Sequence, residues 1–159
     1  MKYAGLIKND FSAAPGVSVT FYTQGCPHHC LGCQNPETWD FDGGKEFTTE
    51  VLEEILIALN ENGIERSLAI QGGEPLCPDN LFLTYLIIKT VKDKSPNTKI
   101  YVWTGYTKEE FETFTNPKAK EILNLIDCLI DGPYIAAERD ITLPMRGSKN
   151  QRIFYFDKN

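Results

Sequence analysis

The sequence predicts an α/β protein built around a largely parallel β-sheet. Two observations carry this prediction. Short β-branched and aromatic segments alternate four times with segments of helical periodicity, and the links between them are short. At 159 residues and 42% hydrophobic content, the chain is long enough for one domain with a real core and too short for two. We therefore expect a single domain over residues 1–159.

Five segments have the composition of strands. Residues 17–23 (VSVTFYT) are β-branched and aromatic, and they lead into a cysteine-rich loop. Residues 67–71, 99–104 and 126–130 are short apolar segments, and each is followed within two residues by glycine. The segment 152–156 (RIFYF) predicts a last strand at an edge of the sheet.

Amphipathic helices are expected between these strands. Thr48 or Thr49 can cap the first, because apolar residues then recur at helical spacing. A second begins at Pro78 with a similar pattern. The residues 107–110 fit a capping box, and Asn116 before a proline fits a helix cap, so two further helix starts are predicted.

An unusual motif follows each of the first four strands. The cysteine run follows the first strand, GGEP (72–75) the second, TGY (104–106) the third and DGPY (131–134) the fourth. The carboxyl ends of parallel strands share one face of a sheet or barrel, and ligands bind at that face. The sequence therefore predicts that four distant motifs form one site.

Composition excludes several classes of partner. The net charge of −6 and the pI near 4.9 remove the general attraction to phosphate that supports nucleic-acid binding. No apolar run approaches the roughly 20 residues that span a bilayer, and the first ten residues lack the hydrophobic core of a signal peptide. We expect a cytoplasmic protein with neither a nucleic-acid nor a membrane partner.

Three cysteines give the strongest functional signal. Cys26, Cys30 and Cys33 have C-x3-C-x2-C spacing with no fourth cysteine close behind. A 4Fe-4S cluster held by three thiolates keeps one iron open to a ligand that is not protein. A zinc site is the alternative, with His28 or His29 as fourth ligand, but residues between ligands this close seldom turn back onto the same metal.

The remaining cysteines and the histidines are expected to have structural roles. Cys77 and Cys128 lie beside apolar residues, and free cysteine is often a small buried hydrophobe. His28 and His29 are expected to pack in the loop or to hydrogen bond near the cluster.

The motifs resemble a known family. The cysteine run followed by GGEP after the next strand resembles the radical S-adenosylmethionine (SAM) superfamily, and CQNPETWD (33–40) resembles its glycyl-radical-activating branch. The small size, the HxCxGCxN pattern (28–35), DGPY and RGSKNQR (146–152) are most similar to the activating proteins of anaerobic ribonucleoside-triphosphate reductases. This resemblance implies a partial, incomplete parallel β/α barrel of the radical SAM type.

The resemblance also implies an activity. Cys26, Cys30 and Cys33 would hold three irons of a 4Fe-4S cluster, and the amino and carboxylate groups of SAM would bind the fourth. Reductive cleavage of SAM would leave a 5'-deoxyadenosyl radical, which would generate a glycyl radical on the large subunit of the reductase. The implied partners are that subunit and an electron donor such as flavodoxin.

Further residues take implied roles in SAM binding. Gly72 and Gly73 would let the backbone approach the methionine end of SAM, and Glu74 would offer its carboxylate to the ammonium group. The backbone groups implied to meet the adenine are those of Gly32, Cys33 and Gln34. The sequence departs from the common pattern at two positions: glycine at 32 cannot stack on a base as an aromatic residue would, and Ser18 stands where relatives often have arginine.

Two groups of residues keep alternative interpretations. Thr104 and Tyr106 either line the cofactor pocket or merely end a buried strand and lead into a helix. Arg146, Asn150 and Arg152 either contact the partner or brace the C-terminal loop.

Other functions compete with glycyl-radical activation of this reductase. A small radical SAM enzyme with a small-molecule substrate, of the carboxydeazaguanine synthase type, and an activator of another glycyl-radical enzyme share the cysteine loop, but the short length and RGSKNQR argue against both. A non-catalytic iron–sulfur electron carrier or zinc module would have no need of GGEP one strand after the cysteines.

Overall fold

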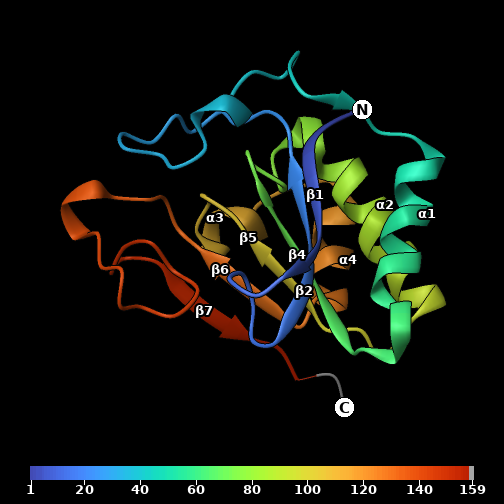
Figure 1. Cartoon of the computed structure of the whole chain (residues 1–159). Helices are drawn as coiled ribbons and strands as arrows, with labels where there is room; N and C mark the ends of the chain where they lie inside the picture. Colours follow the sequence, from blue (N-terminus) through green and yellow to red (C-terminus); the bar gives the residue numbers. More distant parts are fainter. Residues whose placement is uncertain (158–159) are drawn as a thin grey trace.

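The computed structural model describes residues 1–157 and contains a seven-stranded sheet with its main helices on one face (Figure 1). The strands are β1 (Lys2–Asp10), β2 (Val17–Thr23), β3 (Lys45–Glu46), β4 (Arg66–Gly72), β5 (Ile100–Trp103), β6 (Cys128–Asp131) and β7 (Arg152–Tyr155). Their order across the sheet is β3-β1-β2-β4-β5-β6-β7. The chain is therefore a mixed α/β protein.

The sheet is mixed rather than largely parallel. The first four predicted strands are β2, β4, β5 and β6, and they pair in parallel, as predicted. The outer strands β1, β3 and β7 run antiparallel to their neighbours. β7 forms one edge of the sheet, which confirms the prediction for residues 152–156 within one residue.

The helices lie between the parallel strands in the chain, as the periodicity predicts. They are α1 (Thr49–Leu59), α2 (Pro78–Lys94), α3 (Lys108–Glu112) and α4 (Pro117–Leu125), with short 3-10 turns at Pro36–Thr38, Glu61–Gly63 and Ala136–Glu138. The capping box at Thr107 and the side-chain cap at Asn116 are both formed. α1, α2 and α4 cover the same face of the sheet (Figure 1).

The core lies between that face and the helices. Val19 and Phe21 of β2, Ile70 of β4 and Ile87 of α2 are fully buried in it, and each such side chain contributes about 1.5–3 kcal/mol through removal from water. Side chains alternate between the faces of a strand, so the residues between them point to the other face. There Thr20 is also buried, and its hydroxyl donates to a carboxylate oxygen of Asp10 at 2.7 Å.

No helix within residues 1–157 is long and apolar enough to cross a bilayer.

Candidate metal centre and ligand cavity

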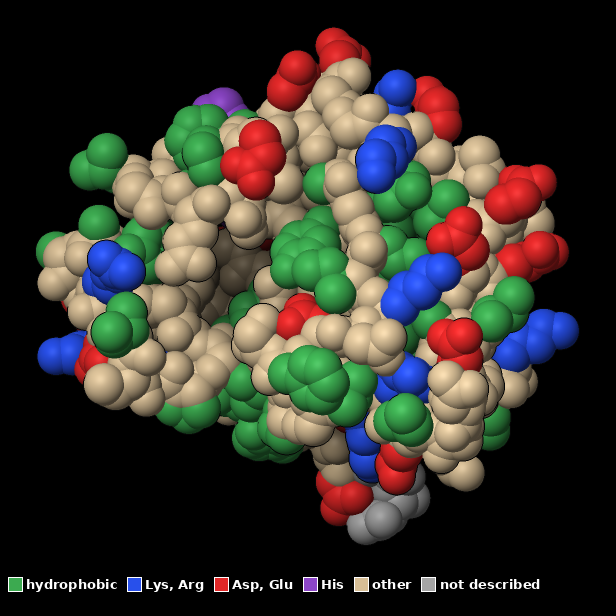
Figure 2. All heavy atoms as spheres, viewed as in Figure 1, with side chains coloured by type: hydrophobic (Ala, Val, Ile, Leu, Met, Phe, Trp, Pro, Cys, Tyr) green, Lys and Arg blue, Asp and Glu red, His purple; other side chains and the backbone are tan. Residues whose placement is uncertain are grey.

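One cavity of about 400 Å³ lies at the carboxyl ends of the four parallel strands. Residues from all four predicted motifs line it, among them Cys26, Gly73, Thr104 and Gly132. The space-filling view shows the molecule hollowed between the cysteine loop and the C-terminal loop (Figure 2). This volume is typical of a site for a small molecule or cofactor. The predicted convergence of the four motifs is confirmed.

The cysteine loop leaves β2 through a glycine that the fold requires. Gly25 has a φ of +101°, and the ring of Phe41 occupies the place of a Cβ atom. The N–H of Gly25 donates to the carbonyl of Thr38 at 2.6 Å, and the N–H of Cys26 donates to that of Trp39 at 3.1 Å. The far end of the loop is thus held against its beginning.

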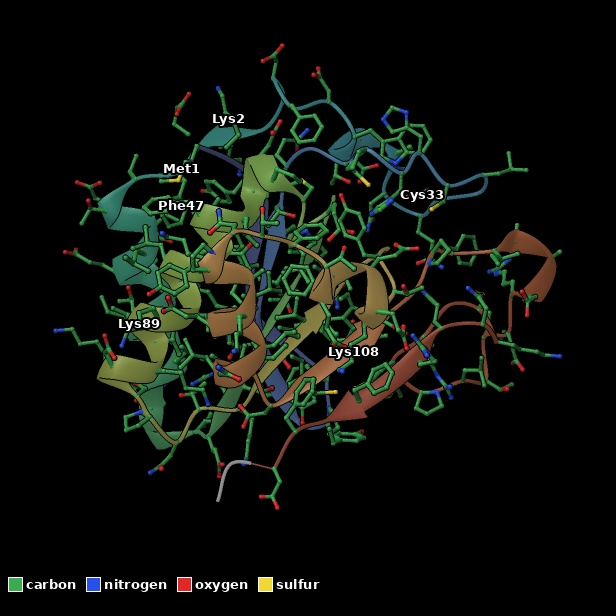
Figure 3. The ribbon with its side chains drawn as sticks, turned by 180° about the vertical axis from the view of Figure 1, so that it is seen from behind. Met1, Lys2, Cys33, Phe47, Lys89 and Lys108 are labelled. Carbon is green, nitrogen blue, oxygen red and sulfur yellow. The ribbon has the colours of Figure 1, made fainter. Side chains whose placement is uncertain are left out.

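All three predicted metal-binding thiols line the cavity. Cys26 is buried, whereas Cys30 and Cys33 are half-buried. Figure 3 shows Cys33 on the opposite side of the molecule from Lys89 of α2. The N–H of Asn35 points to the Cys33 sulfur at 3.4 Å. No group of three or more His, Cys, Asp or Glu side chains within residues 1–157 is arranged to hold a single metal ion. The structure therefore brings the thiols to one wall without gathering them around one point.

Burial raises the pKa of the Cys26 thiol, with a smaller contribution from the nearby Glu74 carboxylate. Thiolate is the form that binds iron, so binding there must also displace a proton.

Both histidines of the loop have partners in the protein, as the sequence predicts. The Nε2 atom of His28 lies 2.7 Å from Oε2 of Glu74. The ring of His29 stacks on Trp39 with a centroid separation of 4.6 Å, and its backbone has a φ of +48°.

The glycine-rich loop is clamped to the start of the cysteine loop. The N–H of Gly73 donates to the carbonyl of Thr23 at 3.0 Å, and the N–H of Glu74 donates to that of Gly25 at 2.8 Å. Gly72 has a φ of +121°, and a Cβ atom on Gly73 would lie 2.8 Å from the carbonyl carbon of Gly25. Two glycines are needed because two backbones pass this close to each other.

Glu74 lines the cavity, and its carboxylate is held by other residues of the protein. Its residue is fully buried, and its carboxylate accepts four hydrogen bonds. Oε1 accepts from Leu76 N at 2.9 Å and Thr104 Oγ1 at 2.7 Å; Oε2 accepts from His28 Nε2 at 2.7 Å and Gly105 N at 2.6 Å. Four donors fill the acceptor sites of a carboxylate. These bonds fix the orientation of the side chain, and its contact with the SAM ammonium group, which the resemblance implies, stays a prediction.

The other predicted site residues divide between the cavity and its surroundings. Cys33 and Gln34 line the cavity, but Gly32 is not among its lining residues and lies against Tyr134. Thr104 is buried directly after β5 and also lines the cavity, so the structure is compatible with both interpretations of this residue.

Tyr106, in contrast, packs its ring against His28 at 4.6 Å and Phe114 at 5.2 Å. It stands outside the cavity lining and supports the side chains that form it.

The C-terminal motif braces the loop that follows β6. Asn150 donates to the carbonyl of Pro133 at 2.7 Å, and Gln151 donates to that of Gly132 at 3.0 Å. Arg152 forms ion pairs of 2.5 Å with both Asp131 and Glu109.

The bracing interpretation is thus confirmed for Asn150 and Arg152. Arg146 differs from both, because it lines the cavity and no carboxylate within residues 1–157 forms an ion pair with it.

Sequence reasoning missed several lining residues. Ser12 and Ala13, from the connection between β1 and β2, carry no motif that could have marked them. Trp103 could have been found, because it precedes TGY at the end of a strand; its indole donates to the carbonyl of Met145 at 2.8 Å and so ties the C-terminal loop to β5.

The residues present fit an iron–sulfur cluster. Three thiols, the preferred ligands of such clusters, line one cavity. Trp39 also lines it, and its buried Nε1–H is the one side-chain nitrogen or oxygen among the buried groups of residues 1–157 that meets no acceptor. This nitrogen is itself buried, so the fit to a cluster rests on the three thiols.

Cys77 and Cys128 stand apart from the site, as predicted. Both are buried, and burial raises the pKa of each thiol to about 12. These thiols behave as small hydrophobic side chains.

Comparison with known proteins agrees with this site. A family model described as "4Fe-4S single cluster domain" matches residues 13–154. Fold and site thus define an α/β protein of the single-cluster 4Fe-4S class.

Similar proteins identify the family within this class. The chain is 35% identical over 157 residues to the anaerobic ribonucleoside-triphosphate reductase-activating protein of Vibrio cholerae, which covers 98% of this chain and 99% of the relative. It is 37% identical to that of Pasteurella multocida, over 98% of both chains, and 34% identical to that of Enterobacteria phage T4, over 97% of this chain and 94% of the relative. The chain therefore belongs to the family of anaerobic ribonucleoside-triphosphate reductase-activating proteins.

Proposed function

We propose that this protein activates an anaerobic (class III) ribonucleoside-triphosphate reductase as a radical SAM enzyme. One observation carries the proposal: the three cysteines and the glycine-rich loop line the same cavity of about 400 Å³. The names of the relatives support the choice of target. When bound, a reduced 4Fe-4S cluster supplies one electron to the SAM sulfonium, which gives methionine and a 5'-deoxyadenosyl radical able to take hydrogen from a glycine Cα of the large reductase subunit.

Cys26, Cys30 and Cys33 are proposed to hold three irons. With no fourth cysteine in the loop, the remaining iron is left for the amino and carboxylate groups of SAM. The N–H group directed at the Cys33 sulfur supports ligation there, because hydrogen bonds to ligand sulfur tune such clusters.

The loop of Gly72, Gly73 and Glu74 is proposed to receive the methionine end of SAM through its backbone. All three residues line the cavity, and the absence of side chains at the glycines leaves their peptide groups accessible to a ligand. Cys33 and Gln34 are proposed to meet the adenine side, with Gly32 shaping the turn at a φ of +78°. Arg146, which forms no ion pair within residues 1–157, adds a cation to the cavity wall, suited to a carboxylate.

The fold is proposed to be an incomplete radical SAM barrel and one domain over residues 1–159. The sheet ends in open edges at β3 and β7, and its helices cover one face only, as in part of a β/α barrel (Figure 1). An enzyme whose substrate is a glycine of another protein needs an opening of this kind. A cytoplasmic location and an electron donor such as flavodoxin complete the proposal.

Anaerobic reconstitution with iron and sulfide, followed by electron paramagnetic resonance (EPR) of the reduced protein with and without SAM, tests this function. We expect the spectrum to change on addition of SAM and 5'-deoxyadenosine to form. An unchanged spectrum would indicate an electron carrier, and a tetrahedral zinc would indicate a zinc module.

A pull-down from anaerobic cells tests the target. Recovery of the large reductase subunit supports the proposal. Formation of 5'-deoxyadenosine without any glycyl-radical subunit in the pull-down would favour a small-molecule radical SAM enzyme instead.

A further inference from the structure

One histidine joins the cysteine loop to the glycine-rich loop. His28 lies between two of the predicted cluster ligands, and its Nε2–H donates to Oε2 of Glu74 at 2.7 Å. These residues are 46 positions apart in the sequence. A side-chain bond thus supplements the backbone bond of 2.8 Å from Glu74 N to the carbonyl of Gly25.

The acceptor of this hydrogen bond is held rigidly. The Glu74 side chain is 1% exposed, and its other donors come from its own loop and from the segment after β5, at Thr104 and Gly105. A buried carboxylate with every acceptor site filled has one low-energy orientation. Glu74 therefore presents Oε2 to His28 as a hydrogen-bond acceptor in a fixed position.

The imidazole ring has a single place to lie. A Cβ atom on Gly105 would stand 2.8 Å from Nε2 of His28, so the ring rests directly on the Gly105 backbone. The Tyr106 ring meets its other side edge-on, at a centroid distance of 4.6 Å and an angle of 75°. Position 105 must lack a side chain for the hydrogen bond to Glu74 to form.

We infer that His28 is a positioning residue, which fixes the cysteine loop against the glycine-rich loop through Glu74. The inference rests on the proposed function. If the cysteine loop carries the cluster and the glycine-rich loop carries the methionine end of SAM, both must present their ligands to the same iron. The bond from His28 to Glu74 sets the spacing between the two loops, and small errors in such spacing cost binding and rate.

Three variants test the inference. His28→Leu removes the donor with similar bulk, whereas His28→Gln keeps an N–H donor of comparable reach. His29→Asn is the matched control in the same loop: it removes the neighbouring imidazole, and asparagine tolerates the φ of +48° there. The readouts are iron and sulfide per chain after reconstitution and the SAM dissociation constant from EPR titration of the reduced cluster.

We expect His28→Leu to assemble a cluster and to bind SAM about tenfold or more weakly, the effect of losing a hydrogen bond to a charged group. His28→Gln should stay within about threefold of the parent protein, a small part of that effect. His29→Asn should match the parent. A His28→Leu protein with parental SAM affinity, or one weakened no more than His29→Asn, overturns the inference.

A fourth variant tests the inference if His28→Leu assembles no cluster. Thr104→Val removes another donor to Glu74 from a strand end outside the cysteine loop, so the cluster ligands are untouched. Weaker SAM binding by Thr104→Val supports the role of the Glu74 network, and parental binding refutes it. If the parent protein itself shows no SAM-dependent spectrum, the proposed function fails instead, and the two failures are distinguishable.

Discussion

Replacing Gly73 by alanine should separate the two loops that form the site. The added Cβ atom would overlap the carbonyl oxygen of Gly25 and lie 2.8 Å from its carbonyl carbon and 3.0 Å from Thr38 O. All of these are backbone atoms, so no side chain can rotate away. Bringing the 2.8 Å contact alone to 3.4 Å, where ordinary contact begins, moves the backbones apart by about 0.6 Å, and relieving the overlap with Gly25 O requires a larger movement.

The loss in the free energy of unfolding can be worked from the contacts that this movement disturbs. Overpacking costs about 1–3 kcal/mol, and the bonds from Gly73 N to Thr23 O (3.0 Å) and from Glu74 N to Gly25 O (2.8 Å) each contribute about 1 kcal/mol. A loss of roughly 3–5 kcal/mol should lower the Tm by about 6–20 °C in a chain of this size.

The assay is thermal unfolding of the reduced, cluster-free protein followed by circular dichroism. Gly5→Ala is the control, because a Cβ atom there meets nothing within 4 Å, and it should leave the Tm unchanged or slightly raised. In reconstituted protein, Gly73→Ala should also abolish the SAM-dependent EPR change. If Gly73→Ala has the same Tm as Gly5→Ala, the close approach of the two backbones is not what holds the loops together.

Three further predictions concern the cysteines and one surface ion pair. Cys30→Ala should lose iron and 5'-deoxyadenosine formation, whereas Cys77→Ala keeps both; iron analysis that shows a loss in the second variant would overturn the ligand assignment. In cluster-free protein at pH 8, iodoacetamide should modify Cys30 but spare Cys77 and Cys128, because burial raises the pKa of these two thiols to about 12; labelling of either, seen by mass spectrometry, contradicts their burial. The hydrogen bonds from Arg152 lower the pKa of Glu109 from 4.5 to about 2, so its stabilisation is present above pH 4.5 and lost as the pH falls through 2. The Tm difference between the parent and Glu109→Gln should therefore shrink over that range, and a constant difference would exclude the ion pair as its cause.

Elements with local signals were predictable from the sequence. Residues 17–23 are the strand β2 itself, because β-branched and aromatic residues fill the segment and a glycine follows it. β1 was not predicted, since Lys2–Asp10 contains a glycine and three charges and owes its extended form to pairing with β2. The direction of the outer strands depends on such pairing and leaves little trace in composition.

In the site, too, features set by neighbouring residues were predictable, and features set by residues far apart in the sequence were not. The motifs located the cavity, because each follows a strand and strand ends meet in space. The orientation of Glu74 could not be predicted, since His28 and Thr104, which fix it, lie 46 and 30 positions away. A motif gives the position of a carboxylate in the chain, but its partners decide whether it faces a ligand or the protein.

The C-terminal motif RGSKNQR acquires a physical explanation from strand register. Asp131 and Arg152 are directly paired residues on β6 and β7, and the guanidinium contacts both carboxylate oxygens. A slip of one residue would break this pair and turn every side chain of β7 to the opposite face. Because the motif sets the register of β7, it also sets where the preceding loop lies, and that loop places Met145 and Arg146 on the cavity wall. An edge strand far from the cysteines in sequence thus completes the cavity that they line.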